Sequence, residues 1–190
     1  MSKAKLIVIS APSGSGKTTI AREILKRHLE MAFSVSATTR KKRDAEVHGQ
    51  DYFFLTEKEF EEKIAQGELI EWERIYGDYY GSLKSQVDYA LRTGTSMLFD
   101  IDVKGALSIK RNYPKDAVLI FIDPPSLESL TQRLSNRKTE SAETLHRRLE
   151  RVPMEMAKGE EFDYRVVNDD LHSAITKVDA IVTKILGTPV

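Results

Sequence analysis

A short loop rich in glycine and serine, close to the start of the chain, has the composition of a phosphate-binding loop. It consists of Ser13-Gly14-Ser15-Gly16-Lys17-Thr18 and lies between the apolar residues 6–9 and a helical pattern. Small residues allow consecutive backbone N–H groups to point at phosphate oxygens, and the helix N-terminus adds partial positive charge. Lys17 can reach the β- and γ-phosphates of a nucleotide, and the Thr18 hydroxyl can bind magnesium. The loop therefore predicts a nucleoside triphosphate site.

Two alternatives to this interpretation are weaker. The full loop pattern has glycine at its first position, where this chain has Ala11, so a flexible turn with an exposed lysine is one alternative. The strand before the loop and the helix after it favour the phosphate site. The second alternative is a regulatory GTPase, because Asp102-Val103-Lys104-Gly105 matches a GTPase switch pattern. The chain has no Asn-Lys-x-Asp motif to read guanine, so we interpret it as a phosphotransferase.

A basic segment follows the loop and suits a phosphorylated acceptor. Residues 38–43 read Thr-Thr-Arg-Lys-Lys-Arg, and arginine binds phosphate through two parallel hydrogen bonds. A solvated charged loop is the ordinary explanation for such a run. Two kinds of polar side chain recur after the basic segment. Hydroxyl groups that can donate to phosphate come from Tyr52, Tyr79 and Tyr80, and acids from Glu46, Asp51, Glu71, Asp100 and Asp102. We therefore predict a small phosphorylated acceptor beside the nucleotide.

These side chains must be positioned by an α/β fold. Apolar runs at residues 5–10, 97–101 and 117–122, with 164–168, predict buried parallel strands, and amphipathic helices separate them. The first helix presents Ile20, Ala21, Ile24, Leu25 and Leu29 on one face. The last helix has an apolar stripe from Leu171 to Ile185 and ends at Gly187. Asp100 and Asp102 end a strand, where ligands of open α/β sheets gather.

Two segments interrupt this alternation. Residues 34–83 are polar and contain a helix that begins at Thr56, forms a capping box with Glu59 and ends at Gly67. Residues 126–157 carry arginines on two expected helices. Pro153 should end or kink the second of these, because proline removes a helical hydrogen bond.

Bulk properties limit the class of protein. With 190 residues the chain forms one domain, and its 29 basic and 29 acidic residues give no field that attracts nucleic acid or membrane. The absence of cysteine excludes disulfides and thiolate metal sites, and the four scattered histidines should lie on the surface. No signal peptide or membrane span is apparent, so we expect a cytoplasmic protein.

Several segments together closely resemble the guanylate kinase family, in family order over essentially the whole chain. They are residues 11–17 (APSGSGK), 33–40 (FSVSATTR), 49–54 (GQDYFF), 69–72 (LIEW), 79–82 (YYGS), 99–102 (FDID), 121–126 (FIDPPS) and 166–169 (VVND). The resemblance implies a P-loop NTPase fold with a central parallel sheet flanked by helices, a small mixed GMP-binding subdomain and a helical lid. It assigns residues 1–33, 84–125 and 157–190 to the core, 34–83 to the GMP-binding subdomain and 126–156 to the lid.

The resemblance also implies the reaction and its residues. ATP phosphorylates GMP, and also dGMP, with Mg²⁺, in purine nucleotide metabolism. ATP would contact Ala11, Pro12, Ser13, Gly14, Ser15, Gly16, Lys17, Thr18, Thr19 and Asn168. The GMP phosphate would lie at Arg40, Arg43, Tyr52 and Tyr80, with Glu46 supporting the arginines, and the guanine at Ser36, Glu71, Ser82 and Asp102. The catalytic residues would be Lys17, Arg40, Asp100 and the lid arginines Arg133, Arg137 and Arg148, with Thr18 and (through water) Asp100 at magnesium.

The chemistry of guanine agrees with these positions. Guanine presents two adjacent donors, N1–H and the 2-amino group, which one carboxylate such as Glu71 can accept, whereas the adenine N1 lone pair would repel it. Lys104, Asn136, Lys138 and Pro153 depart from the family pattern, as do Lys41, Lys42 and Asp44. Two other functions remain as alternatives: a kinase for another nucleoside monophosphate, and a guanylate kinase-like scaffold that binds protein without catalysis. Lys17 and Thr18 favour the enzyme.

Overall fold

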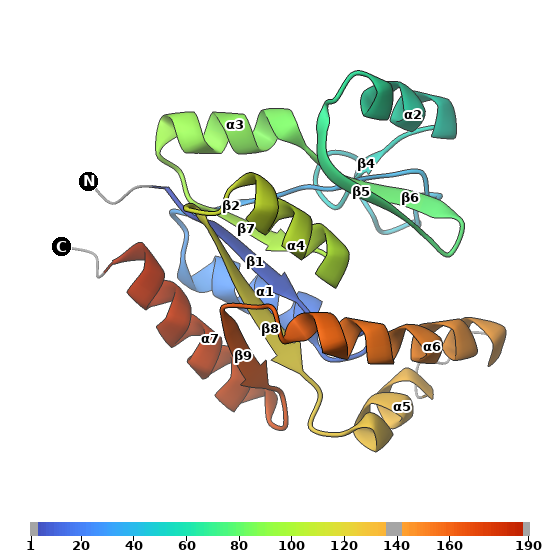
Figure 1. Cartoon of the computed structure of the whole chain (residues 1–190), viewed down its shortest axis with the longest axis vertical. Coiled ribbons are helices and arrows are strands. Elements are labelled where there is room, and N and C mark those ends of the chain that lie inside the picture. The colour runs from blue at the N-terminus through green and yellow to red at the C-terminus, as the bar shows by residue number, and fades with distance from the viewer. Residues whose placement is uncertain (1–3, 136–141, 188–190) are drawn as a thin grey trace.

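A parallel sheet forms the centre of the molecule in the computed structural model, which describes residues 4–135 and 142–187 (Figure 1). Its strands have the order β2-β7-β1-β8-β9, and each neighbouring pair is parallel. The strands are β1 (Leu6–Ser10), β2 (Ala32–Phe33), β7 (Met97–Asp100), β8 (Ala117–Asp123) and β9 (Tyr164–Val167). The predicted buried parallel strands are thereby confirmed.

Helices cover both faces of this sheet. Alternate residues of β1 point to opposite faces, so Leu6 and Val8 pack in one cluster, and Ile7 and Ile9 in another. The first cluster is completed by the helices α3 (Lys84–Thr93) and α4 (Val103–Asn112). The second is completed by α1 (Lys17–Arg27) and α7 (Leu171–Leu186). Burial on both sides explains why β1 is apolar at every position except its last.

The end of α1 differs from the prediction. The helix stops at Arg27, so Leu29 lies beyond it and is 86% exposed, not on the buried face. The backbone leaves the helical region at His28, whose Nε2 lies 2.7 Å from a carboxylate oxygen of Asp179 in α7. His28 is 9% exposed, so its predicted surface position is wrong too. The contact between His28 and Asp179 accompanies the end of α1 and the burial of His28. Neither could be predicted from the local pattern, because Asp179 is distant in sequence.

A second, smaller sheet is built from residues between 34 and 83. Its strands have the order β4-β3-β6-β5. They are β3 (Ala37–Thr38), β4 (Phe53–Phe54), β5 (Leu69–Ile75) and β6 (Asp78–Leu83). β5 and β6 form a hairpin whose loop residues, Tyr76 and Gly77, have φ angles of 55° and 98°. Positive φ at both positions is the conformation of a type I′ turn, whose twist matches that of the strands.

The helix α2 (Glu57–Ala65) lies beside this sheet. Its N-cap is Thr56, whose hydroxyl accepts from the backbone N–H of Glu59, while the Glu59 carboxylate accepts from the N–H of Thr56. The helix ends before Gly67, which has a left-handed φ of 67°. The predicted capping box and its glycine terminus are confirmed.

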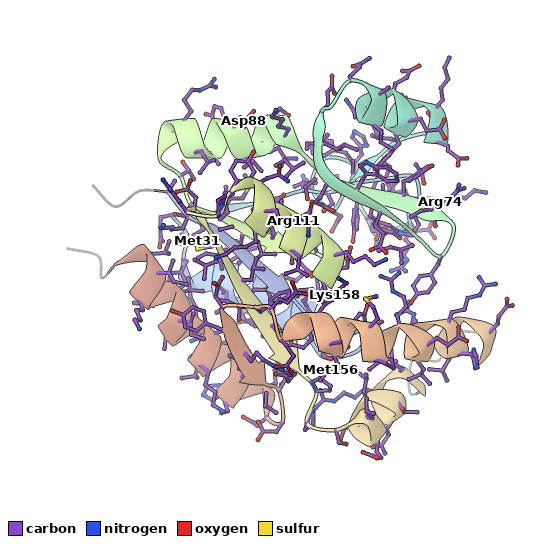
Figure 2. All side chains as sticks on the ribbon, in the orientation of Figure 1. Met31, Arg74, Asp88, Arg111, Met156 and Lys158 are labelled. Carbon is purple, nitrogen blue, oxygen red and sulfur yellow. The ribbon has the colours of Figure 1, made fainter. Side chains whose placement is uncertain are left out.

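The helices α5 (Leu127–Ser135) and α6 (Ala142–Gly159) follow β8. Leu130 and Leu134 of α5 pack against Val152 of α6 in a separate cluster. The prediction was that Pro153 ends or kinks this helix; α6 continues through Pro153, so the helix does not end there. Packing by the buried Val152 and the partly buried Met156 (labelled in Figure 2), before and after the proline, stabilises the helix against the lost hydrogen bond.

Outside the gap at residues 136–141 and the two chain ends, none of the helices combines the length and apolar character that spanning a bilayer requires. The carboxyl ends of β1 and β7 lie together in the sheet, with Ile9 paired to Asp100. Loops from these neighbouring strands therefore meet at one edge, where the small sheet and α6 also approach.

Candidate active site

The loop after β1 has the backbone of a phosphate cradle. Gly14 and Gly16 have φ angles of 91° and 88°, which side chains with a Cβ rarely adopt. The N–H of Ser15 donates to the carbonyl of Pro12 over 3.1 Å, which closes a tight turn. Gly16 is the N-cap of α1, so the N–H groups of the loop and the positive end of the helix converge.

Asn168, directly after β9, supports this loop from behind. Its side-chain N–H donates to the Ser15 carbonyl over 2.8 Å, and the residue is 3% exposed. A Cβ on Gly16 would lie 2.5 Å from the Asn168 amide nitrogen, so glycine is required by space as well as by φ. Arg133 of α5 donates to the Asn168 carbonyl over 3.1 Å. Asn168 and Arg133 therefore position the loop and do not line the cleft in front of it.

Lys17, at the start of α1, joins the loop to the end of β7. Its ammonium lies 2.8 Å from a carboxylate oxygen of Asp100 and donates to the Ile101 carbonyl over 2.9 Å. Burial lowers the pKa of Lys17, but the attraction and hydrogen bond of Asp100 outweigh it, and the net pKa is raised. Lys17 therefore stays charged, as a group that binds phosphate must.

A second basic group lies in the loop that joins β3 to β4. The guanidinium of Arg40 bonds to Glu46 over 2.6 Å and lies over the Tyr52 ring, 5.3 Å from its centre. The other Glu46 oxygen accepts from the backbone N–H of Arg43. The bond to Glu46 raises the pKa of Arg40, and the same bond lowers the pKa of Glu46. Glu46 thus fixes the arginine segment and keeps it cationic.

A buried carboxylate forms the opposite wall. Glu71 of β5 is 7% exposed, and one of its oxygens accepts from the Ser82 hydroxyl over 2.7 Å. Burial raises the pKa of Glu71 to about 7, although the bond to Ser82 opposes the shift. A Cβ on Gly105 of α4 would lie 2.7 Å from the second Glu71 oxygen, so only glycine leaves room for the carboxylate. A buried acid with so few partners suits a ligand that donates hydrogen bonds.

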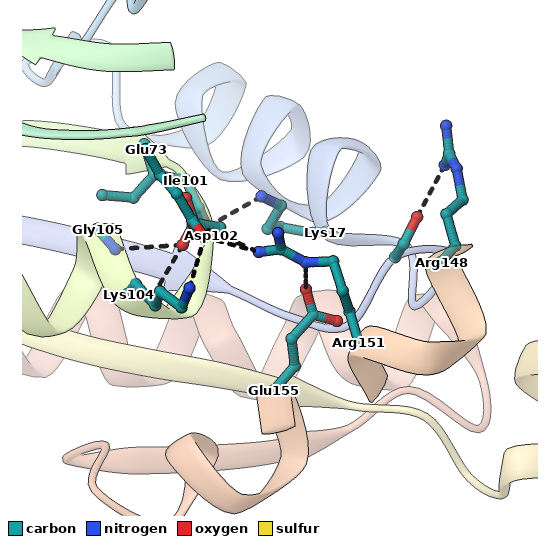
Figure 3. Close-up of polar contacts among 10 residues, drawn as sticks. Lys17, Glu73, Ile101, Asp102, Lys104, Gly105, Arg148, Arg151 and Glu155 are labelled. Atoms are coloured by element: carbon teal, nitrogen blue, oxygen red, sulfur yellow. Dashed lines mark hydrogen bonds and ion pairs between the residues drawn. The ribbon is translucent and has the colours of Figure 1, made fainter. Parts of the chain in front are cut away.

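Asp102 lies next to Glu71 and caps α4. One of its oxygens accepts from the backbone N–H groups of Lys104 and Gly105, over 2.8 and 3.2 Å. Burial, and then the neighbouring carboxylate of Glu73, raise the pKa of Asp102. In Figure 3 Asp102 lies close to Lys17, so an acid that can face a base and a cation for phosphate are adjacent.

One continuous cleft connects these groups. A cavity of about 340 Å³ is lined by the phosphate loop, Glu71 and Asp102, and a cavity of about 630 Å³ by Arg40, Arg43 and Glu46. The residues common to both include Thr18, Ser36, Tyr52, Tyr80 and Asp100. Strand alternation places Tyr80 in the cleft, whereas Tyr79 stacks on Phe60 with ring centres 5.1 Å apart. The structure thus gathers most of the predicted site residues.

The helix α6 brings a further arginine to the loop. Arg148 donates to the hydroxyl of Ser13 over 2.8 Å and lines both cavities. Arg137, the third predicted lid arginine, lies outside the described residues, as do Asn136 and Lys138.

Sequence reasoning did not assign every residue of the cleft. Among those that it missed are Tyr76, Arg151 and Glu155, which line the cleft, and Glu73, which contacts Arg151. The spacing of Glu71 and Glu73, two apart on a strand, was the available signal for Glu73. Nothing local distinguishes Arg151 or Glu155 from other charged residues of an amphipathic helix. Arg151 meets Glu73 of the small sheet and Glu155 approaches Arg151, and the first of these contacts exists only in the assembled fold.

Comparison with known proteins decides the family. The family model described as guanylate kinase matches residues 3–185. A guanylate kinase of Chlorobaculum tepidum is 49% identical over 97% of this chain and 93% of its own length. A guanylate kinase of Thermotoga maritima is 46% identical, over 95% of this chain and 86% of its own. The chain belongs to the guanylate kinase family.

A solved structure supports the same assignment. The crystal structure of guanylate kinase from Anaplasma phagocytophilum has a TM-score of 0.80 and 30% identity, and covers 99% of this chain and 89% of its own. The predicted P-loop NTPase fold and the prediction of a nucleoside monophosphate kinase are thereby confirmed. The chemistry of the individual residues rests on the geometry above.

Proposed function

We propose that this chain transfers the γ-phosphoryl group of ATP to GMP, giving ADP and GDP, and accepts dGMP as well. The observation that carries the proposal is a single cleft with a phosphate loop and Lys17 at one end and the buried Glu71 at the other. The cleft could therefore hold two nucleotides at once, with the phosphates of one at the loop and the hydrogen-bond-donating base of the other at Glu71.

Guanine would be selected by hydrogen bonds to Glu71. Its carboxylate accepts from N1–H and the 2-amino group, while Ser82 holds the carboxylate in place. Ser36 and Asp102 supply further polar groups around the same cavity. Adenine would place a lone pair against the acid, and sites built on such buried hydrogen bonds discriminate by roughly 10⁴–10⁵-fold.

The acceptor phosphate would bind at the opposite wall of the cleft. Arg40 and Arg43 would hold its oxygens, with hydroxyl donors from Tyr52 and Tyr80, all of which line the larger cavity. Glu46 keeps the Arg40 guanidinium oriented through the 2.6 Å bond. The phosphate would then lie near Thr18 and Asp100, which line the same cavity and would be close to the end of the triphosphate.

Transfer requires alignment and charge neutralisation, not a covalent nucleophile. A phosphate oxygen of GMP attacks the γ-phosphorus in line, and the bond from the γ-phosphorus to the β–γ bridging oxygen breaks. Lys17 and Arg148 stabilise the charge that develops on the transferred group, and Arg133 holds the loop through Asn168. We expect Arg137 to act with Arg148.

The donor groups fit a magnesium ion that is held mainly by the substrate phosphates. Mg²⁺ keeps several waters and uses one or two protein oxygens, and the Thr18 hydroxyl and Asp100 carboxylate line the same cavity. Among the described residues no cluster of three or more acidic, histidine or cysteine side chains provides a separate metal cage. Thr18 and, through water, Asp100 would hold Mg²⁺ there, and the ion would supply positive charge that offsets the charge of the triphosphate.

We further propose that residues 34–83 and 126–156 move against the core as substrate-binding subdomain and lid. The small sheet lies wholly within the first range, and α5 and α6 occupy the second, with α6 continuing to Gly159. Closure of both would exclude water and so suppress hydrolysis of ATP.

A coupled assay of ADP formation from ATP and Mg²⁺ tests the function, with GMP, dGMP, AMP, CMP, UMP and dTMP offered singly. We expect turnover with GMP and weaker turnover with dGMP. Turnover with another monophosphate would keep the phosphotransferase and contradict the guanine site. Folded protein that binds GMP without turnover would favour the scaffold alternative.

A further inference from the structure

Glu73 is a shielded acid that the reaction as described does not use. It lies on β5, two residues after Glu71, so both side chains lie on the same face of the strand. The strand register pairs it with Tyr80 of β6. Its side chain is 15% exposed, although its partners belong to other parts of the molecule. Arg74, on the opposite face of β5, pairs with Glu57 of α2 instead (Figure 2).

The partners of Glu73 come from the core and from α6. Lys104, at the start of α4, donates to Glu73 over 2.7 Å. Arg151 of α6 lies 3.4 Å from both carboxylate oxygens (Figure 3). Both interactions act on the Glu73 carboxylate, which therefore joins the small sheet, the core and α6 at one point. The bond to Lys104 fixes the carboxylate in the place where Arg151 meets it.

Arg151 belongs to one face of α6. Arg148, Arg151 and Glu155 are spaced by three and four residues, so they follow one another along the helix surface. Arg148 and Arg151 both lie over the ring of Tyr76, 5.9 and 6.0 Å from its centre. Glu155 is 6% exposed and approaches the Nε of Arg151 at 3.5 Å. Arg151 is thus held from its own helix while it reaches across to β5.

This face also carries the contact between α6 and the phosphate loop. Arg148 bonds to Ser13 three residues before Arg151, less than one helical turn away. A helix is stiff over this distance, so the place of Arg151 sets the place of Arg148. Tyr76, in the hairpin of the small sheet, is a second group of the substrate-binding side that contacts this face of α6.

We propose that Glu73 is a positioning residue: through Arg151 it holds α6 so that Arg148 stays at the phosphate loop. Glu73 shares its strand with Glu71, so a guanine that fixes β5 also fixes the lid arginine over the phosphates. Occupancy of the base site is thereby linked to charge neutralisation at the transferred group. The inference rests on the proposed function and adds to it Glu73, which acts through Arg151.

A double-mutant cycle with Glu73→Gln and Arg151→Gln tests the bridge, because both changes preserve side-chain length. We expect each variant to lower kcat with GMP about tenfold, and the double variant no further than either alone, as for directly coupled groups. Both variants keep Glu71, Ser82 and Asp102, so the KM for GMP should change less than kcat, with the larger change in Glu73→Gln because Glu73 neighbours Asp102. ADP should form in excess of GDP in the variants, because a displaced α6 admits water.

Arg147→Gln is the matched control. Arg147 is on the same helix and pairs with Glu143 over 2.6 Å on the exposed surface, so its loss should leave kcat unchanged. Wild-type kcat in either bridge variant, or additive losses in the double variant, would overturn the inference. If Glu73→Gln does not fold, Arg151→Gln alone tests the bridge through kcat and the ADP to GDP ratio.

Arg148→Gln separates this inference from the proposed function. Strong loss of turnover in Arg148→Gln with wild-type turnover in Glu73→Gln would overturn the bridge alone. Wild-type turnover in Arg148→Gln would overturn the lid chemistry and the bridge together. No GMP turnover by the unaltered protein would overturn the function and, with it, the inference.

Discussion

The two ends of the cleft bind their ligands by different physical means. The phosphate end is one contiguous segment, in which backbone N–H groups, a helix N-terminus and Lys17 act together. The guanine end gathers side chains from distant segments: Glu71 and Ser82 from the hairpin, and Asp102 from the start of α4. The first site is a local conformation, whereas the second exists only in the assembled fold.

The difference also appears in the charges. Asp100 keeps the buried Lys17 ionised and raises its pKa, so the phosphate end is charged before substrate arrives. Burial instead raises the pKa of Glu71 to about 7, so the guanine end is held at the edge of ionisation. The buried Glu71 carboxylate lowers the stability of the fold but allows recognition of the base, and active sites commonly combine these two effects.

The largest expected effect lies at the phosphate end. Lys17→Ala should fold normally and lower kcat by about 10³–10⁵-fold, because it removes a cation from the transferred group. Initial rates of ADP formation at saturating GMP, with circular dichroism to check the fold, measure this. Turnover within tenfold of the unaltered protein would remove the phosphate-loop mechanism.

The matching change at the guanine end should be smaller and should act on selectivity. Glu71→Gln keeps the size of the side chain but sets an amide donor against the donors of guanine, and should lower kcat/KM for GMP about 10²–10³-fold. The rate with AMP should not fall in parallel. An unchanged preference for GMP over AMP would contradict the base assignment.

The same substitution should stabilise the fold. Burial raises the pKa of Glu71 from its ordinary value of 4.5 to about 7, so stability falls as pH rises through that window, and the loss is complete above it. Glu71→Gln removes this loss and should raise the unfolding free energy at pH 8 by up to about 3 kcal/mol. Urea unfolding measures it. Glu62→Gln, on the exposed side of α2, is the control and should change little.

The smallest effect concerns pH. Guanine needs the ionised carboxylate, and Glu71 takes up a proton below pH 7, so GMP affinity should fall by up to tenfold per pH unit below that value. Calorimetric titration with GMP between pH 5.5 and 8.5 measures this. Glu71→Gln should retain only the pH dependence of the GMP phosphate. An identical profile in both proteins would assign the titration to another group.

The phosphate end could be predicted in detail from the sequence because its information is local. Glycine at two positions with positive φ, a preceding buried strand and a following helix suffice to define the loop. The capping box at Thr56 was predictable for the same reason. At the guanine end, Glu71 and Asp102 were assigned through resemblance to a family, since nothing in their neighbours reveals that they meet.

Contacts between distant segments account for what the sequence did not predict. Pro153 remains inside α6 because Val152 and Met156 are packed on either side of it. Leu29 lies outside α1 because His28 turns toward Asp179. Glu73 and Arg151 look like surface charges until β5 and α6 come together and shield both from solvent.

The sequence by itself determined the parallel sheet, the phosphate loop and the two ends of α2, because hydrophobic periodicity, glycine and capping residues act over a few residues. Only the tertiary structure decided the ionisation of Glu71, the room that Gly105 leaves for it, and the bridge from Glu73 to Arg151. These depend on burial and on distances between groups far apart in the chain, and such quantities exist only after the segments have packed.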